Sequence, residues 1–184
     1  MNCGPLGGRP AVGAPGSPST TPVRLSLFHI HYTMPRYIND IIIHCSASPY
    51  RRDDRAADIK AWHTLPPPRG RGWSNIGYHY VIDLDGTIER GRPISQAGSH
   101  CKGHNAHSIG ICYVGGLDQD GNPADTRTAE QRASLLKLLT NLLMMYGCSV
   151  HGHHDYNRTK LCPCFDARTE YANLVRQIRE KRCS

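Results

Sequence analysis

Short apolar runs along the chain predict the strands of a central sheet. The run 40–45 is rich in isoleucine and is typical of a strand buried on both faces. Asp85 and Gly86 separate two further runs, and this residue pair predicts a hairpin turn between them. We therefore expect strands at 40–45, 77–83, 87–89, 108–114 and 149–153.

Apolar positions at helical spacing predict three helices. Asp53 or Asp54 can cap a first helix that runs toward His63, and the prolines at 66–68 stop it. The second helix follows a capping box, and the third lies near the carboxyl end of the chain. Their caps and apolar positions are Thr128, Gln131, Leu135, Leu139, Leu142, Tyr146 and Gly147 for the second, and Asp166, Tyr171, Leu174, Val175 and Ile178 for the third. The pattern predicts one α/β domain, a central mixed β-sheet flanked by helices.

Residues 1–22 differ in composition from the rest of the chain. They contain no acidic residue and many Gly, Pro, Ser and Thr, so they cannot bury enough surface to offset the entropy of ordering. Prolines interrupt every apolar stretch here, so we expect no secretory signal and synthesis in the cytoplasm. Met34 opens a more protein-like segment, so residues 1–33 are either an upstream extension or a genuine mobile leader. We expect 1–33 to be a disordered Gly/Pro/Ser-rich leader or upstream extension, and 34–184 to be the folded domain.

Charge and composition exclude several classes of protein. The 22 basic and 15 acidic residues leave a net charge of +7, but the basic residues are dispersed, so we expect no nucleic-acid partner. No apolar run approaches the roughly 18 residues that span a bilayer. The eight cysteines are too few for a disulfide-stapled miniprotein and are expected to remain thiols in a reducing cytosol. The 11 histidines, several of them close together, favour a metal or proton-transfer site.

Reactive side chains fall where predicted strands end. His44 lies at the end of the first strand, where open α/β sheets tend to place ligand sites, and His153 follows the last strand. Cys162 lies in the loop beyond, close to Lys160. Catalytic zinc takes three protein ligands plus water and prefers imidazole and thiolate, so two histidines and one cysteine fit such a site.

The same residue types allow other interpretations. Taken singly, His44 could be a polar residue at the end of a strand, and His153 could belong to a solvated turn. A second metal site could use His100, His104 and His107, although no carboxylate or thiolate lies near them in the sequence. Cys164 could complete a closed, structural site of two cysteines and two histidines, but only Pro163 separates it from Cys162, which places the pair poorly for one ion.

Eight short motifs then occur in the order in which a known family has them. They are His44-Cys45-Ser46-Ala47-Ser48, Gly77-Tyr78-His79-Tyr80, Gly98-Ser99-His100, Gly103-His104-Asn105, Ser108-Ile109-Gly110-Ile111, Val114-Gly115-Gly116, Gly152-His153-His154-Asp155 and Lys160-Leu161-Cys162-Pro163. This set, over roughly 37–171, resembles the zinc-dependent N-acetylmuramoyl-L-alanine amidases of the type-2 amidase group. That group includes phage endolysins and shares its fold with peptidoglycan recognition proteins; the resemblance is greatest to the compact phage lysozyme-type amidases.

The resemblance implies that His44, His153 and Cys162 bind Zn²⁺. The family pattern Gly-His-X-Asp selects His153, but the loop to Cys162 is about one residue longer than in the phage relatives. Counting back from the cysteine by the shorter loop would select His154 instead. We favour His153 because the flanking glycine and aspartate anchor the motif.

The resemblance also assigns catalytic roles to Tyr78 and Lys160. The alternative for Tyr78 is an inward-facing aromatic residue of a strand, and the alternative for Lys160 is an exposed cation of a loop. It places the loop 98–108 beside the substrate cleft. The candidates there for contact with the glycan or stem peptide are His100, Lys102 and Asn105.

The implied reaction is hydrolysis of the amide bond between N-acetylmuramic acid and L-alanine in bacterial peptidoglycan. We expect zinc to supply activated water, Lys160 to donate to the oxyanion, and Tyr78 to orient the water or share its proton; the general base stays open. We expect a monomeric amidase that lyses the cell wall after release, with a net positive charge that favours anionic envelopes. The alternatives are a non-catalytic peptidoglycan-binding module and an intracellular amidase that recycles soluble muropeptides.

Overall fold

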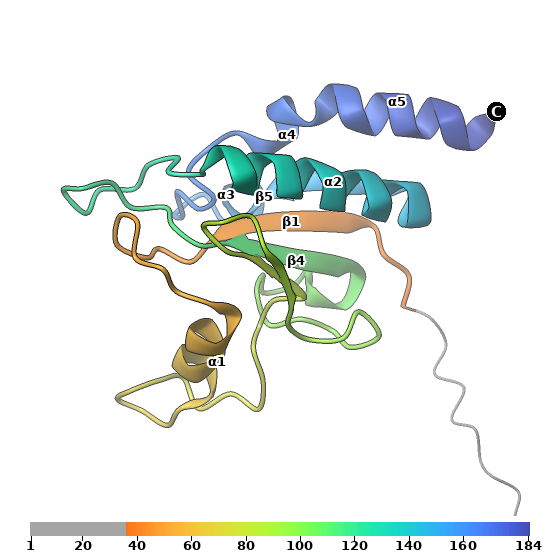
Figure 1. Cartoon of the computed structure of the whole chain (residues 1–184). Coiled ribbons are helices and arrows are strands. Elements are labelled where there is room, and N and C mark those ends of the chain that lie inside the picture. Colours follow the sequence, from red (N-terminus) through yellow and green to blue (C-terminus); the bar gives the residue numbers. More distant parts are fainter. Residues whose placement is uncertain (1–35) are drawn as a thin grey trace, which may run out of the picture. The chain divides into compact units, whose positions relative to one another are not determined.

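Five strands form one mixed sheet within residues 36–184, the part of the chain that the computed structural model describes (Figure 1). The strands are β1 (Asp40–Cys45), β2 (Tyr80–Ile82), β3 (Ile88–Arg90), β4 (Ser108–Tyr113) and β5 (Ser149–Gly152). Their order across the sheet is β3-β2-β4-β1-β5, with β3 alone antiparallel to its neighbour. The predicted leader, residues 1–33, lies outside the described residues and stays a prediction.

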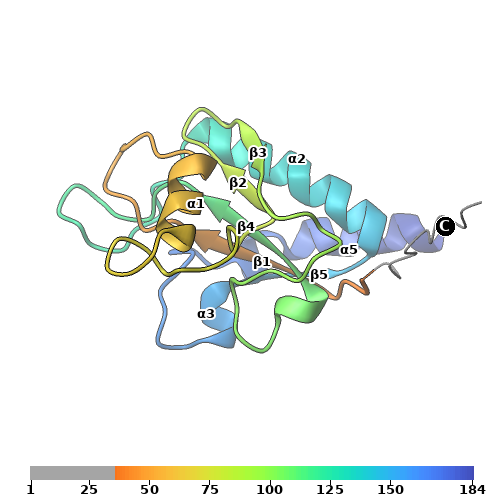
Figure 2. The ribbon, with the colours of Figure 1, turned by 90° about the horizontal axis from the view of Figure 1, so that it is seen from below.

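Helices cover both faces of the sheet. The helices α2 (Ala129–Tyr146) and α5 (Ala172–Cys183) lie on one face, and α1 (Ala56–Thr64) lies on the other (Figures 1 and 2). Three single turns complete the fold: η1 (Asn105–His107), α3 (His153–Tyr156) and α4 (Ala167–Glu170). The predicted α/β fold with a central mixed sheet is confirmed. No helix in the described part of the chain is long and apolar enough to cross a bilayer.

The alternation of side chains along β1 divides the core in two. Ile41 and Ile43 pack with the leucines of α2, whereas His44 lies on the face that α1 covers, opposite Cys112 of β4. Both faces are shielded, which explains why every residue from Ile41 to Cys45 is buried. A histidine at the end of such a strand is therefore held inside the protein rather than in water.

The capping signals for the longest helix are confirmed. The Thr128 hydroxyl accepts from the Gln131 amide at 3.0 Å, and the Gln131 side chain accepts from the Thr128 amide at 3.0 Å. Gly147 ends the helix with φ 65°, a left-handed conformation that favours glycine. Gly86 in the hairpin between β2 and β3 likewise has φ 83°.

The predicted cap of the first helix is wrong. Arg55 occupies the N-cap position, and its amide donates to the Asp58 carboxylate at 2.8 Å. Asp54 pairs with Arg52 at 2.9 Å, and Asp53 pairs with Arg55 at 3.1 Å. Both predicted capping carboxylates are therefore engaged in ion pairs with arginines and neither occupies the N-cap position.

Candidate metal centre and active site

The parallel register of β1 and β5 brings two histidines together. Ile43 of β1 pairs with Gly152, the last residue of β5, so the residues that follow them in the chain, His44 in β1 and His153 at the start of α3, emerge at the same edge of the sheet. The centroids of the two imidazole rings are 4.6 Å apart. Register alone thus juxtaposes side chains that are more than 100 positions apart in the sequence.

The loop after α3 carries Cys162 to the same point. The Cys45 amide donates to Cys162 Sγ at 3.2 Å, and the His154 amide donates to the Cys162 carbonyl at 2.9 Å. The buried Tyr113 hydroxyl donates to the Pro163 carbonyl at 2.7 Å. Strand and core residues therefore fix the position of this thiol.

The three side chains form a cluster with the spacing of metal ligands. One ligand atom from each of His44, His153 and Cys162 lies within 4.8 Å of the other two, and His44 Nδ1 is 3.8 Å from Cys162 Sγ. Tetrahedral zinc, with Zn–N near 2.0–2.1 Å and Zn–S near 2.3 Å, separates its ligand atoms by roughly 3.3–3.6 Å. Small side-chain adjustments would close the cluster around one ion, so the residues present fit zinc.

The other candidate ligands lie elsewhere. Among residues 36–184, this cluster is the only group of three histidine, cysteine or acidic side chains close enough to share an ion. His154 Nε2 lies 3.6 Å from Asp155 Oδ1, and Cys164 Sγ lies 3.8 Å from Cys45 Sγ. The His104 ring packs against that of Tyr156 in a tilted arrangement, with 3.9 Å between ring centroids.

Burial keeps the clustered imidazoles neutral. The pKa of His44 is well below its usual value, first because of desolvation and then because of His100 and His153. Desolvation also lowers the pKa of His153, with a further contribution from the cation of Lys160. A neutral imidazole has the free lone pair that a metal ligand needs.

Tyr78 lies next to His44, and Lys160 lies near His153. The Tyr78 ring is half-buried, with its centroid 5.1 Å from that of His44, and desolvation raises the pKa of its phenol well above the usual value. The phenol therefore stays protonated and can donate or share a hydrogen bond. Lys160 is exposed, close enough to His153 to influence its pKa.

A cavity of about 430 Å³ adjoins the cluster through His153. All three predicted substrate-contact residues line it, but their surroundings differ. Lys102 is exposed, whereas Asn105 Oδ1 accepts from two backbone amides of its own loop, at 2.9 and 3.0 Å. His100 is 9% exposed, and its Nδ1 lies 3.0 Å from His44 Nε2; desolvation lowers the pKa of His100 to about 3.

Two aromatic residues of this cavity escaped the sequence interpretation. Trp73 and Tyr156 both line it, and Trp73 stacks on His63 with 4.8 Å between ring centroids. Trp73 lies in a loop and Tyr156 in a single helical turn, where no periodicity predicts which way a side chain points. The only sequence signal was their aromatic character next to predicted site loops.

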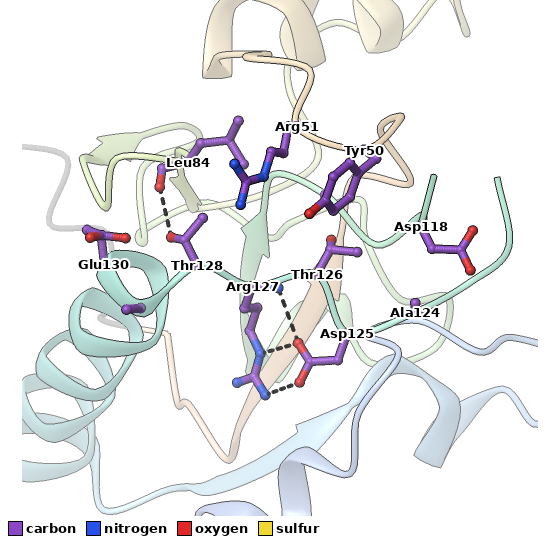
Figure 3. A pocket seen from close by; sticks show the side chains of 12 residues that line it. Tyr50, Arg51, Leu84, Asp118, Ala124, Asp125, Thr126, Arg127, Thr128 and Glu130 are labelled. Carbon is purple, nitrogen blue, oxygen red and sulfur yellow. Dashed lines mark hydrogen bonds and ion pairs between the residues drawn. The ribbon is translucent and has the colours of Figure 1, made fainter. Parts of the chain in front are cut away.

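A larger cavity, about 720 Å³, lies beside the start of α2 (Figure 3). It contains none of the predicted site residues. The buried Arg127 guanidinium there pairs with Asp125 at 2.8 Å and Glu170 at 2.8 Å, and the Thr128 hydroxyl donates to the Leu84 carbonyl at 2.8 Å (Figure 3 draws the Asp125 and Leu84 contacts). These groups are occupied in holding α2 and α4 in place.

Comparison with known proteins gives a consistent result. The family described as N-acetylmuramoyl-L-alanine amidase matches residues 23–165. The chain is 39% identical over 140 residues to an endolysin of Klebsiella phage KP32, covering 76% of this chain and 89% of that protein. It is 40% identical over 129 residues to an endolysin of Escherichia phage T7, covering 70% and 82%.

Solved structures share the fold. An N-acetylmuramoyl-L-alanine amidase, LysC from Clostridium intestinale, superposes with a TM-score of 0.61 at 31% identity, covering 75% of this chain and 85% of that one. Drosophila peptidoglycan recognition protein LB superposes with a TM-score of 0.58 at 24% identity, covering 75% and 80%, and this likeness concerns the fold alone.

Proposed function

The chain belongs to the N-acetylmuramoyl-L-alanine amidase family and is a peptidoglycan amidase, and from this premise we propose that it is zinc-dependent, with His44, His153 and Cys162 as the ligands. The observation that carries the proposal is the convergence of two imidazoles and one thiol within 4.8 Å at the edge of the sheet. Three protein ligands leave a fourth position for water, as catalytic zinc sites require. His153 is preferred over His154 because its ring, and not that of His154, belongs to this cluster.

A backbone amide already donates to the sulfur of the proposed cysteine ligand. The Cys45 amide donates to Cys162 Sγ at 3.2 Å, and such a bond strengthens when sulfur carries negative charge. A zinc ion bound here would polarise the scissile carbonyl and lower the pKa of water to near 7.

Two residues then act on the substrate. The protonated Tyr78 phenol, next to His44, orients the attacking water or shares its proton. Lys160 donates to the carbonyl oxygen as negative charge develops there, a role in which one donor typically contributes about 10²–10³-fold in kcat. Its exposed position beside His153 leaves it free to meet a substrate that enters from solvent.

The cavity next to His153 is the proposed place of the glycan and stem peptide. Lys102 is its one formally charged lining side chain, while Trp73 and Tyr156 offer flat apolar surfaces. A cation beside aromatic rings suits a peptide that carries carboxylates. His100 and Asn105 contribute to the wall, although their polar atoms already have partners within the protein.

Mass spectrometry of digested peptidoglycan, with metal analysis of the same sample, tests the proposal. We expect a free L-alanine amino terminus on the released peptides and about one zinc per chain. Cleavage at another bond, or full activity after exhaustive chelation, would contradict it.

The relatives named endolysins favour intact cell wall as the substrate, reached after release from the cell that makes the protein. Loss of turbidity of purified walls, compared with cleavage of soluble muropeptides, distinguishes lysis from muropeptide recycling. Binding to walls without cleavage would instead indicate a recognition module.

A further inference from the structure

We propose that His100 is a positioning residue for the metal centre. Its Nδ1 accepts a hydrogen bond from His44 Nε2–H, and this bond holds His44 Nδ1 toward the ion. This inference rests on the proposed zinc site. It gives His100 a task different from the substrate contact that the sequence suggested.

The contact between the two rings is short and shielded from water. His44 Nε2 and His100 Nδ1 are 3.0 Å apart, and the residues are 1% and 9% exposed. The ring planes meet at 82°, so the edge of one imidazole points at the other. On the far side of the His44 ring, Nδ1 lies 3.8 Å from Cys162 Sγ. One nitrogen of His44 therefore faces the ligand cluster and the other faces His100.

The proton positions along this line are then determined. If His44 Nδ1 gives its lone pair to a metal, Nε2 must carry the proton and donate it to His100 Nδ1. His100 must in turn carry its own proton on Nε2, which lies 3.4 Å from the Ser108 hydroxyl oxygen. The Ser108 hydroxyl donates onward to the His104 carbonyl at 2.8 Å. Every group along this line thus has a donor or acceptor of the required kind, and each hydrogen bond is donated away from His44.

Two glycines form the slot that holds the His100 ring. A Cβ at Gly110 would lie 2.5 Å from His100 Cδ2, and a Cβ at Gly98 would lie 2.8 Å from His100 Nε2. Either distance is far below contact, so any larger residue would displace the imidazole. Two positions without side chains therefore leave room for a ring that faces a proposed metal ligand.

The backbone of His100 is fixed as well. Asn105 Oδ1 accepts from the amides of His100 and Cys101, at 2.9 and 3.0 Å. Ring, backbone and hydrogen-bond partner are all constrained, as expected of a residue that orients another. Partners of this kind typically contribute about 10–100-fold to metal affinity.

The test compares His100→Asn with His100→Leu. The two side chains have similar shape, but only the amide oxygen of Asn, attached like Nδ1 of histidine, can accept from His44 Nε2. The measurement is the zinc dissociation constant by chelator competition, together with the absorption spectrum of the Co²⁺ form. His107→Ala, an exposed histidine of the same loop, is the control.

We expect His100→Leu to bind zinc about 10–100-fold more weakly than the wild type, with a changed Co²⁺ spectrum. His100→Asn should lie between the two, and His107→Ala should match the wild type. If the Leu variant does not fold, the zinc affinities of His100→Asn and Ser108→Ala are each compared with that of the wild type. We expect both variants to bind zinc more weakly.

Wild-type affinity in the Leu variant, or an Asn variant no tighter than Leu, would overturn the inference. So would unchanged affinity in both Asn and Ser108→Ala where Leu cannot be measured. His44→Ala separates the two levels of the argument: if it binds zinc as tightly as the wild type, the proposed metal centre itself fails. If it loses zinc while the His100 series shows no effect, the positioning role alone fails.

Discussion

The cavity beside His153 and the larger one beside Arg127 differ in how their polar atoms are satisfied. Around Arg127, the guanidinium and the Asp125 and Glu170 carboxylates pair with each other. At the edge of β1 and β5, two imidazole nitrogens and one sulfur instead lie within 4.8 Å of one another, close enough to share one ion. Residual binding capacity, and not volume, therefore marks the candidate active site.

Removing one ligand should have the largest effect of all. We expect Cys162→Ser to lower amidase turnover at least roughly 1,000-fold, since the several kcal/mol that a metal supplies convert at about 1.4 kcal/mol per tenfold. The matched control is Cys164→Ser, which changes a thiol two positions away and outside the cluster. Assay of purified walls, with circular dichroism to verify folding, checks both. Equal losses of turnover in the two variants would contradict the assignment of Cys162, and not Cys164, to the metal cluster.

Lys160→Ala tests whether the open side of the cluster stabilises developing charge. A decrease of about 10²–10³-fold in kcat is expected, with KM nearly unchanged, because the donor acts chiefly in the transition state. Arg158→Ala removes an exposed cation from the same loop and should leave kcat near the wild-type value. A rise in KM with kcat preserved would assign Lys160 to binding instead.

In the Arg127 region, substitution should change stability rather than catalysis. Arg127→Met leaves two partly exposed carboxylates without their partner, and we expect a loss of about 2–3 kcal/mol in the free energy of unfolding. Arg132→Met breaks a more exposed pair with Asp125 and should cost under about 1 kcal/mol. Denaturant unfolding measures both. A large drop in kcat of the folded Arg127 variant would show that this cavity belongs to the site.

The smallest expected effect concerns acid stability beside Tyr78. Burial, followed by Arg71 and Arg92, lowers the pKa of His63 to about 4 from 6.5, so the unfolded chain binds more protons between these values. The stability from neutral His63 is complete above pH 6.5 and is lost as pH falls toward 4. His63→Gln should therefore lose less stability on acidification than the wild type, by roughly 1 kcal/mol at pH 5.5. Unfolding curves at pH 7.5 and 5.5 measure this, with the exposed His107→Gln as control; identical pH dependence in all three proteins would contradict it.

Local signals predicted the frame of the molecule well. The isoleucine run of β1, the capping box at Thr128 and the glycine at 147 depend on neighbours within one turn or one strand, so the sequence contains their whole cause. The cap of α1 was predicted wrongly for a related reason. Arginines next to Asp53 and Asp54 compete for the same carboxylates, and helix patterns do not weigh that competition.

The supports of the candidate site were harder to predict. Strand ends indicated His44 and His153, but the contact between His44 and His100 joins residues 56 positions apart. It arises from the course of an irregular loop and from a slot between Gly98 and Gly110. No periodicity encodes such a contact, so the sequence did not predict it; the substrate contact that the resemblance implies for His100 stays a prediction.

X-ray absorption at the zinc edge of the purified protein tests the central claim most directly. The account predicts one sulfur near 2.3 Å and two imidazole nitrogens near 2.0–2.1 Å, with one further light atom from solvent. A second sulfur, a fourth protein ligand, or zinc without any sulfur neighbour would contradict it.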